Sequence, residues 1–302
     1  MADKEKKRFF ILTKEELALI GITFLWGTTF LIIHTAMRTS GPLFFVGFRF
    51  ILAGIFASIL FWRSLRNLTL HDLFAGIVIG VPIFLGYSLQ TAGLKTIASS
   101  QSAFITAVYV PLVPLLQWVI LRKRPRLTSI IGVIFAFFGL LLVSGQGLDG
   151  LAFSKGEFLT LVSAFAIASE IIFISLFAGR VDSCRVTVVQ LYVAGFLSFA
   201  VMPLNGEYIP AFSWAWFLAG SGLAAMSALI QLTMNWAQKS VSPTRATIIY
   251  TGEPVWAGVV GRIAGERLPH LAFLGALFII IGILISELKP KSRIKTNSSP
   301  KM

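Results

Sequence analysis

The chain has 302 residues, of which 56% are hydrophobic and only 13% are charged, and its mean hydropathy is +0.83. A soluble domain carries about a quarter charged residues to solvate its surface, so this composition excludes a soluble protein and predicts one embedded in lipid. The formal charge of +13 comes from 26 lysines and arginines against 13 acidic residues.

Apolar stretches of about 20 residues follow one another along the chain, each long enough for a helix to cross about 30 Å of hydrocarbon. Ten such segments are predicted to span the membrane, in chain order 16–36, 42–62, 73–94, 101–121, 128–146, 157–178, 186–204, 214–237, 245–264 and 269–287. The connections between them are short and rich in glycine, proline, serine or asparagine. The sequence therefore predicts an all-α membrane protein with ten transmembrane helices.

The basic residues predict the orientation of these helices, because lysine and arginine concentrate in cytoplasmic loops. With the N-terminus in the cytoplasm, 20 of the 26 basic residues fall in cytoplasmic segments and five in external ones, which leaves Arg49 inside a helix. We therefore expect both termini to be cytoplasmic, with residues 288–302 forming a basic tail near anionic headgroups. Topology accounts for the basic excess, so no nucleic acid is expected as a partner.

The sequence repeats itself at an offset of 143 residues. Residues 111–143 and 254–286 align without gaps, with identities that include Pro111 on Pro254 and two glycines in register. The predicted organisation is one repeat over residues 16–146 and a second over residues 157–287.

Each repeat holds five predicted helices, an odd number, so the second enters the membrane from the opposite side. Inverted repeats of this kind are common in secondary transporters, where two halves alternate between inward-open and outward-open states around a midplane site. The sequence therefore favours alternating-access transport. A duplicated scaffold without a pathway is the alternative.

Several motifs resemble those of EamA-domain proteins. The run FLWGTTF at 24–30 resembles their W-G-[ST]-[ST]-F pattern, and Phe48-Arg49-Phe50 resembles their R-F signature. The segment Glu253-Pro254-Val255, the turn Gly265-Glu266-Arg267-Leu268 and the helix with Gly275 and Gly282 resemble the closing part of each EamA repeat.

This resemblance covers residues 16–287 and identifies the chain with the drug/metabolite transporter superfamily. It implies a ten-helix carrier of the cell inner (plasma) membrane, and many members export amino acids, metabolites or toxic compounds. The first repeat departs from the pattern, since its turn reads Arg122-Lys123-Arg124 where a G-E pair is usual. Glu170 is a second departure, because that helix is often wholly uncharged in the family.

Two acids lie in the interior of predicted membrane helices, away from the helix ends, where a charged group costs about 2.5–3.5 kcal/mol on insertion scales. Glu253 is about 14 Å into its helix, near the midplane, and the following Pro254 removes a backbone donor. Glu170 is about 18 Å into its helix. Either carboxyl group is a candidate for binding a cation or an amine and for proton coupling. A purely structural role at the kink is equally open for Glu253.

Arg49 is the third ionisable residue within the predicted membrane helices. We expect a structural role for it, either by snorkelling to the interface or by capping a carbonyl group. An ion pair between Arg49 and Glu170 is left open. Pro111 and Pro254 are likewise expected to shape the backbone rather than to bind substrate.

Uncharged polar residues gather on helical faces, which in lipid must point to other helices or to a wet cavity. Ser227, Gln231 and Asn235 form one such stripe at intervals of four residues. The predicted substrate-binding or coupling residues are Trp26, Tyr87, Gln90, Tyr109, Glu170, Gln231, Asn235, Tyr250, Glu253 and Trp256. Trp62, at a helix end, is instead predicted to be an interface anchor.

The sequence thus predicts an exporter of small organic solutes such as amino acids, amines or drugs, with a small-molecule substrate and the lipid bilayer as its partners. A membrane enzyme is not expected, because no paired carboxylates occur. Cys184 is the single cysteine and the three histidines stand apart, so no metal or cofactor is expected. A non-transporting scaffold or lipid-carrier partner is the alternative, and a monomer or a homodimer is equally open.

Overall fold

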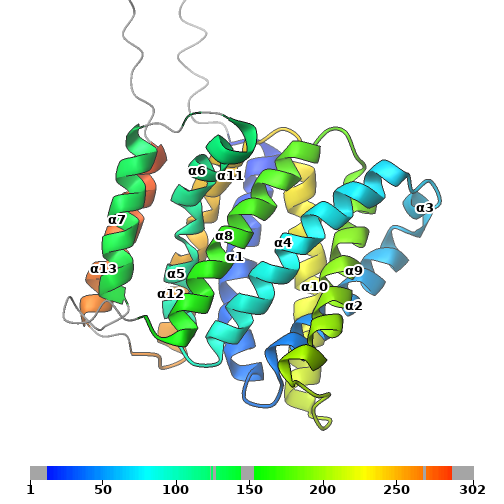
Figure 1. The fold of residues 1–302 in the computed structure, drawn as a ribbon, viewed down its shortest axis with the longest axis horizontal. Helices are drawn as coiled ribbons and strands as arrows, with labels where there is room; N and C mark the ends of the chain where they lie inside the picture. Colours follow the sequence, from blue (N-terminus) through cyan, green and yellow to red (C-terminus); the bar gives the residue numbers. More distant parts are fainter. Residues whose placement is uncertain (1–11, 123, 125–126, 144–152, 268–269, 288–302) are drawn as a thin grey trace, which may run out of the picture.

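The computed structural model describes residues 12–122, 124, 127–143, 153–267 and 270–287, which form a bundle of α-helices (Figure 1). The helices are α1 Lys14–Ala36, α2 Pro42–Leu60, α3 Trp62–Leu65, α4 Leu70–Leu94, α5 Ser99–Thr106, α6 Tyr109–Leu121, α7 Leu127–Val143, α8 Lys155–Phe177, α9 Ser183–Val201, α10 Trp214–Ala237, α11 Pro243–Tyr250, α12 Gly252–Ile263 and α13 His270–Glu287. A 3-10 turn, Pro203–Asn205, follows α9. The predicted basic tail 288–302 lies outside the described residues.

The predicted all-α membrane fold is confirmed. Within the described ranges, seven helical stretches are long and apolar enough to cross a membrane, and Leu127–Gly139 and His270–Gly282 are shorter apolar helices. The ninth predicted segment, 245–264, is divided between α11 and α12. Large apolar side chains cover the outside of the bundle, and Ile59 and Phe196 are 69% and 62% exposed. Such a surface matches lipid and not water.

Two predicted helices are broken where a continuous helix was expected. The segment 101–121 is divided into α5 and α6, and the segment 245–264 is divided into α11 and α12. Pro111 and Pro254 lie in the first turn after each break, where a proline is tolerated because its missing N–H would have no intrahelical partner. The second break places Glu253 at the start of a helix and not in the middle of one.

Capping side chains begin the first helix of each half. The Thr13 hydroxyl accepts a hydrogen bond from the Glu16 backbone N–H, and the Glu16 carboxylate accepts one from the Thr13 N–H at 2.9 Å. Ser154 and Glu157 repeat this capping box at the start of α8. These caps start both helices two residues before the predicted apolar segments.

Equivalent helices of the two halves pack in equivalent ways. α4 packs on α8 and α9, and its counterpart α10 packs on α1 and α2. Likewise α5 contacts α8, and α11 contacts α1. α1 and α8 begin at opposite ends of the bundle (Figure 1), which we call the first face, where α1 begins, and the second face, where α8 begins. This reciprocity is that of two inverted repeats.

The contact between α7 and α13 shows the two-fold relation at atomic detail. A Cβ atom on Gly139 would lie 2.5 Å from the carbonyl oxygen of Gly275. A Cβ atom on Gly282 would lie 2.6 Å from the carbonyl oxygen of Gly132. These four glycines are the repeat-matched ones, paired crosswise, so the two helices run antiparallel. Only glycine permits this approach of the two backbones.

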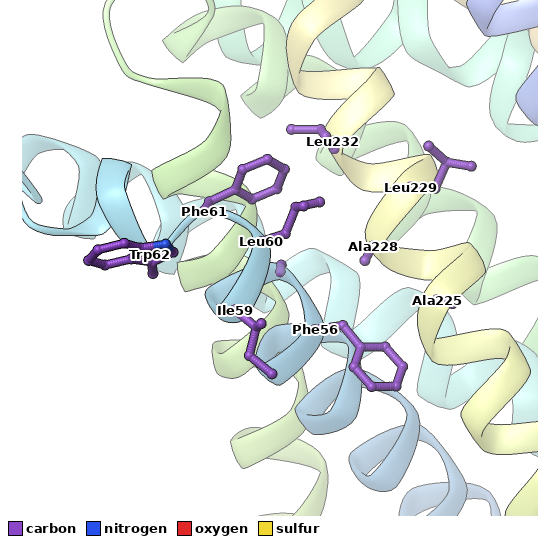
Figure 2. Close-up of a pocket in the computed structure, with 10 residues that line it drawn as sticks. Phe56, Ile59, Leu60, Phe61, Trp62, Ala225, Ala228, Leu229 and Leu232 are labelled. Atoms are coloured by element: carbon purple, nitrogen blue, oxygen red, sulfur yellow. The ribbon is translucent and has the colours of Figure 1, made fainter.

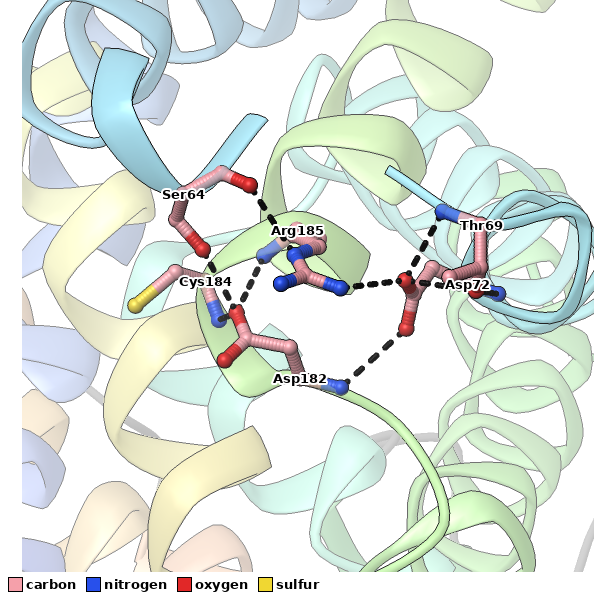
Figure 3. A network of polar contacts seen from close by, with 6 residues as sticks. All are labelled: Ser64, Thr69, Asp72, Asp182, Cys184 and Arg185. Atoms are coloured by element: carbon pink, nitrogen blue, oxygen red, sulfur yellow. Dashed lines mark hydrogen bonds and ion pairs between the residues drawn. The ribbon is translucent and has the colours of Figure 1, made fainter. Parts of the chain in front are cut away.

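A polar network at the first face ties α9 to α4 and to the short helix α3 (Figure 3). Asp72 forms an ion pair with Arg185 at 3.2 Å and accepts a hydrogen bond from the Thr69 hydroxyl at 2.7 Å. Asp182 caps α9 and accepts a hydrogen bond from the Ser64 hydroxyl at 3.1 Å. Arg185 also donates to the Ser64 carbonyl oxygen at 3.0 Å. The network therefore holds α3 through the hydroxyl group and the backbone carbonyl oxygen of Ser64.

Candidate substrate site

Glu253 lies in the first turn of α12, directly after the break. Its side chain is buried, and its Oε2 accepts a hydrogen bond from the Tyr109 hydroxyl at 3.0 Å. A helix start presents free N–H groups and the positive end of the helix dipole, both of which favour a carboxylate. Tyr109 itself begins α6 at the equivalent break. The two breaks therefore meet and hold one acid between them.

Aromatic rings border this acid. Trp26 of α1 is fully buried, stacks on Tyr109 with ring centroids 6.4 Å apart, and meets Tyr250 edge-on at 5.7 Å. The adjacent Gly27 lets α1 approach closely, because a Cβ atom there would lie 2.7 Å from the Glu253 carbonyl oxygen. The tryptophan–glycine pair of the first motif thus has a physical reason: the glycine brings the indole to the break.

Glu170 stands at the end of a row of amide side chains. The Asn235 side chain donates to the side-chain amide oxygen (Oε1) of Gln190 at 3.1 Å, and the Gln190 side chain donates to Oε1 of Gln231 at 2.7 Å. Gln231 then donates to Oε1 of Glu170 at 2.8 Å. We call Asn235, Gln190 and Gln231 the amide relay. Because every amide donates in the same direction, the relay aligns its dipoles toward the carboxyl group.

Arg49 is buried and does not snorkel, contrary to one expectation. Its Nε donates to the Ser227 hydroxyl at 2.6 Å, and its guanidinium lies 5.3 Å from the ring centroids of both Phe50 and Tyr87. No ion pair joins it to Glu170. The reason is that α2 is covered by α4, α9 and α10, so the side chain stays inside the bundle, where its partners are two aromatic rings and one hydroxyl group.

Several buried polar atoms at this centre have no hydrogen-bond partner among the described residues. Glu170 Oε2 and Glu253 Oε1 are unpartnered acceptors, and Trp26 Nε1 and one terminal nitrogen of Arg49 are unpartnered donors. The two acids interact electrostatically with each other, and Tyr87 interacts with both. An unmade hydrogen bond in a buried place costs about 1–3 kcal/mol. The arrangement therefore suits a bound polar molecule.

These side chains define what we call the central site, and each is at most 2% exposed. Its members are Trp26, Arg49, Tyr87, Tyr109, Glu170, Gln231, Tyr250 and Glu253. Among the described residues, no three His, Cys, Asp or Glu side chains lie close enough to hold a metal ion. The structure thus brings most of the predicted residues together from α1, α2, α4, α6, α8, α10, α11 and α12.

Two predicted residues lie away from the central site. Gln90 is buried but donates to the Thr106 hydroxyl at 3.1 Å, between α4 and α5. Trp256 is 40% exposed, and its ring packs edge-on against Phe24 at 5.2 Å. The buried stripe of α12 passes through every fourth residue from Glu253, so the Trp256 ring lies beside this stripe and points outward.

Three residues near the site were not predicted. Gln190 links the relay, and the Thr187 hydroxyl accepts a hydrogen bond from Asn235 at 3.0 Å. Gln238 donates to the Tyr250 hydroxyl at 3.4 Å. The signal in the sequence was that Thr187 and Gln190 are polar and lie one helical turn apart in the mainly apolar segment 186–204. Only the neighbouring helix α10 shows what that pair contacts.

On each face of the bundle, a glutamate at the start of one half's first helix contacts a broken helix of the other half. At the first face, Glu16 of α1 forms an ion pair with Arg245 of α11. At the second face, Glu157 of α8 accepts a hydrogen bond from Gln101 of α5 at 2.8 Å. We call these the first-face latch (Glu16–Arg245) and the second-face latch (Glu157–Gln101). With both contacts formed, every side chain of the central site is buried.

Glu266, in the turn after α12, adds to the closure of the second face. Its carboxylate accepts hydrogen bonds from the backbone N–H groups of Ser99 and Ser100 at 2.9 and 3.1 Å, and from the Ser100 hydroxyl at 2.5 Å. Partial burial opposes ionisation, but these hydrogen bonds outweigh it and hold the pKa of Glu266 below its ordinary value of 4.5. The turn is thereby fixed to the start of α5.

Comparison with known proteins finds the same two halves. The profile of the EamA-like transporter family matches residues 13–145 and again residues 154–288. An uncharacterized transporter of Archaeoglobus fulgidus is 27% identical over 277 residues, which cover 91% of this chain and 86% of that protein. The uncharacterized inner membrane transporter YedA of Escherichia coli (strain K12) is 26% identical over 284 residues, 90% of either chain.

One relative carries a substrate in its name. The S-adenosylmethionine/S-adenosylhomocysteine transporter of Chlamydia muridarum is 26% identical over 298 residues, which cover 91% of this chain and 93% of that protein. A solved crystal structure of a protein that is 14% identical superposes with a TM-score of 0.65, over 89% of this chain and 94% of that one. This likeness shows a shared fold.

Proposed function

The chain belongs to the EamA-like transporter family, and on that premise we propose that it exports small organic cations or zwitterions across the cell inner membrane. As a member of this family it is a multi-pass membrane transporter and not an enzyme. The proposal extends this to the substrate class, the direction and the binding residues. Transport is proposed to be outward because many of the proteins that this chain resembles are exporters.

The observation that carries the proposal is the pair of buried acids that each keep one oxygen unpartnered. Glu170 and Glu253 each receive one neutral donor and no cation. An ammonium or sulfonium group between them would supply the missing positive charge. The free indole N–H of Trp26 would then donate to an acceptor on the same molecule, and the rings of Tyr109 and Tyr250 would cover its apolar part.

The name of the Chlamydia muridarum relative fits this chemistry. S-adenosylmethionine joins a sulfonium cation and an amino-acid group to a flat aromatic base. Such a molecule matches two acids beside aromatic side chains. It is therefore the first compound to test against this chain, together with aromatic amines and aromatic amino acids.

Proton coupling follows from the same pair of acids. A buried carboxylate without a counter-charge is costly, so each acid needs either a proton or a cationic group when the site is closed. Binding of a cationic substrate would then release protons, and release of the substrate would take them up. The exchange links export of the substrate to proton entry.

Alternating access would open one latch at a time. Each latch joins one half to the other at one face only, so breaking the first-face latch exposes the central site to that face while the second-face latch stays closed. The inverted repeat makes the two openings equivalent movements. Pro111 and Pro254 at the helix breaks are assigned to this hinge, and Arg49 to support of α4 and α10.

Transport by purified protein in proteoliposomes tests the proposal. Candidate solutes are first screened by the rise in melting temperature on binding, and uptake of radiolabelled hits is then measured with and without an imposed pH gradient. Glu170→Gln and Glu253→Gln should each lower transport at least about tenfold, which corresponds to the loss of about 1.4 kcal/mol, and should weaken the response to pH.

Glu15→Gln is the matched control, since Glu15 is an acid in the first turn of α1, about 16 Å along the helix from Trp26, the α1 residue of the central site. Unchanged transport in both variants, with all proteins folded, would exclude the two acids from the site. If no solute of the tested classes binds or moves, the non-transporting scaffold becomes the better account.

A further inference from the structure

An apolar groove lies on the outside of the bundle, between the last turns of α2 and the middle of α10 (Figure 2). Its volume is about 580 Å³, within the range of about 300–1,000 Å³ that is usual for ligand pockets. Every side chain that lines it is aliphatic or aromatic: Phe56, Ala57, Ile59, Leu60, Phe61, Trp62, Ala225, Ala228, Leu229 and Leu232. The groove is therefore suited to a hydrocarbon chain.

Two arginines stand at the Trp62 end of this groove. The guanidinium of Arg66 lies 4.3 Å from the centroid of a Trp62 ring, and that of Arg63 lies 5.5 Å from it. Both arginines are exposed, and neither forms an ion pair with an acid in the described part of the chain. Two uncompensated positive charges thus flank one aromatic side chain at the membrane interface.

The nearby acids are already engaged. In the network of Figure 3, Asp72 pairs with Arg185, and Asp182 accepts a hydrogen bond from Ser64 of α3. Because the hydroxyl and the carbonyl oxygen of Ser64 are both held, α3 has a fixed position. The arginines on either side of Ser64 are therefore presented from a fixed turn, and neither forms an ion pair with Asp72 or Asp182.

From this combination we infer a binding site for an anionic phospholipid. Its phosphate would lie between Arg63 and Arg66, where charge complementarity and charge-assisted hydrogen bonds favour it. One acyl chain would lie along the groove over the small side chains of Ala225 and Ala228. The groove ends at the first face, which the distribution of basic residues assigns to the cytoplasmic side, and anionic lipids are concentrated in the cytoplasmic leaflet.

Native mass spectrometry of the full-length protein tests this site. The purified protein is stripped of lipid in detergent and offered equal amounts of phosphatidylglycerol, phosphatidylethanolamine and phosphatidylcholine. The unmodified chain should retain phosphatidylglycerol preferentially. The double variant Arg63→Gln/Arg66→Gln should lower its retention about thirtyfold, in line with the contribution of two basic residues near a headgroup.

Two further variants separate this site from general surface charge. Arg124→Gln/Arg180→Gln removes the same charge from two exposed residues outside the groove and should leave retention unchanged. Ala228→Phe fills the groove without changing charge and should also displace the lipid, while size-exclusion chromatography and circular dichroism report that each variant is folded.

Three results would overturn the assignment. Equal retention by the two double variants would show that Arg63 and Arg66 have no special role. Undiminished retention by Ala228→Phe would show that the groove is not occupied by the lipid. A dimer that Ala228→Phe abolishes, without loss of lipid, would assign the groove to a second copy of the chain.

Discussion

The two halves of the molecule place equivalent residues around the central site but give them different chemistry. Counted from the N-caps of equivalent helices, Arg49 of α2 corresponds to Gln190 of α9, and Tyr87 of α4 corresponds to Gln231 of α10. The contact of the Arg49 guanidinium with the Tyr87 ring is therefore the counterpart of the hydrogen bond between the two glutamines. One geometry serves a cation–π contact in one half and an amide pair in the other.

The two acids show the same difference between equivalent positions. Both belong to the second half, and the equivalent positions of the first half hold uncharged residues. Glu170 stands at the position that Thr29 has in α1, and Glu253 stands at the position that Val110 has in α6. The first half contributes Trp26 and Arg49 to the same centre. The duplicated helices therefore place equivalent positions around one centre, and the different residue types at these positions in the two halves make the centre chemically asymmetric. A site of this kind suits a ligand with two chemically different ends.

The faces differ in the same way. Glu16 and Glu157 are equivalent third residues of capping boxes, and Arg245 and Gln101 are equivalent residues of α11 and α5. One latch is an ion pair and the other is a hydrogen bond from a neutral amide. Because the Arg245 side chain is 61% exposed, its pair is screened and worth on the order of 1 kcal/mol.

The largest expected effect comes from breaking the symmetric contact of α7 and α13. Gly139→Ala and Gly282→Ala each place a Cβ atom against a backbone carbonyl oxygen, so the helices must separate. We expect each to lower the free energy of unfolding by about 1–3 kcal/mol, and by similar amounts because the positions are equivalent. Denaturant titration in micelles measures this. Gly21→Ala, with open space around it, should cost nothing, and equal stability of all three variants would contradict the packing argument.

The next effect concerns Gln190 as a positioning residue. Gln190→Leu removes the donor that orients Gln231, which in turn donates to Glu170. We expect about a tenfold loss of transport, equivalent to one buried hydrogen bond of about 1.4 kcal/mol, together with a shifted pH profile of transport. Ser198→Ala on the same helix is the control, because its hydroxyl bonds only to the Ala194 carbonyl oxygen. A pH profile identical to that of the unmodified protein would remove the relay from the mechanism.

A smaller effect is expected from the latches. In a Cys184→Ser background, buried Ala103 and Thr247 occupy equivalent positions in α5 and α11 and can be replaced by reporter cysteines. Breaking the first-face latch with Arg245→Gln should raise labelling of Thr247→Cys and lower that of Ala103→Cys, each by about fivefold for an interaction of about 1 kcal/mol.

Gln101→Leu breaks the second-face latch and should shift the two labelling rates in the opposite directions. High salt should weaken the first-face latch more than the second, because only the first is an ion pair. If both latch variants raise labelling at both positions, the contacts are ordinary packing and not alternating closures.

The smallest effect concerns the turns that follow α6 and α12. Where the first half has Lys123, the second has Glu266, whose lowered pKa marks a carboxylate preferred in the folded state. This contribution is present above the ordinary pKa of 4.5 and is lost as the pH falls through the lower folded value. Melting temperatures between about pH 6 and about pH 3 should therefore fall less in Glu266→Gln than in the unmodified protein. The same slope in both would remove Glu266 from the closure of the second face.

Much of the fold could be predicted from local pattern. Apolar length located the helices, and the matched prolines and glycines located the repeat. The capping residues that extend α1 and α8 are charged or polar, so an apolar window missed them. The helix breaks were not predicted because a proline can either kink a helix or begin a new one. Only the packing of the two helical pieces against other helices decides between these outcomes.

The site was predictable as a set of polar residues in lipid, but not as an arrangement. Trp256 was predicted to line the substrate cavity, yet its ring lies on the outside of α12. Gln190 was overlooked because a single amide in an apolar helix carries no direction of its own. Its role comes from Gln231 and Asn235 on a different helix.

The sequence by itself determined that this protein is embedded in a membrane, that it is helical and that it consists of two related halves. The physical reason is local: in hydrocarbon every backbone group must be hydrogen-bonded within its own segment, so apolar length and composition suffice. The tertiary structure alone decided that the two acids of the second half lie among aromatic side chains of the first half. Contacts between helices depend on the rotation and separation of each pair, which close approaches such as that at Gly27 determine between residues far apart in the chain.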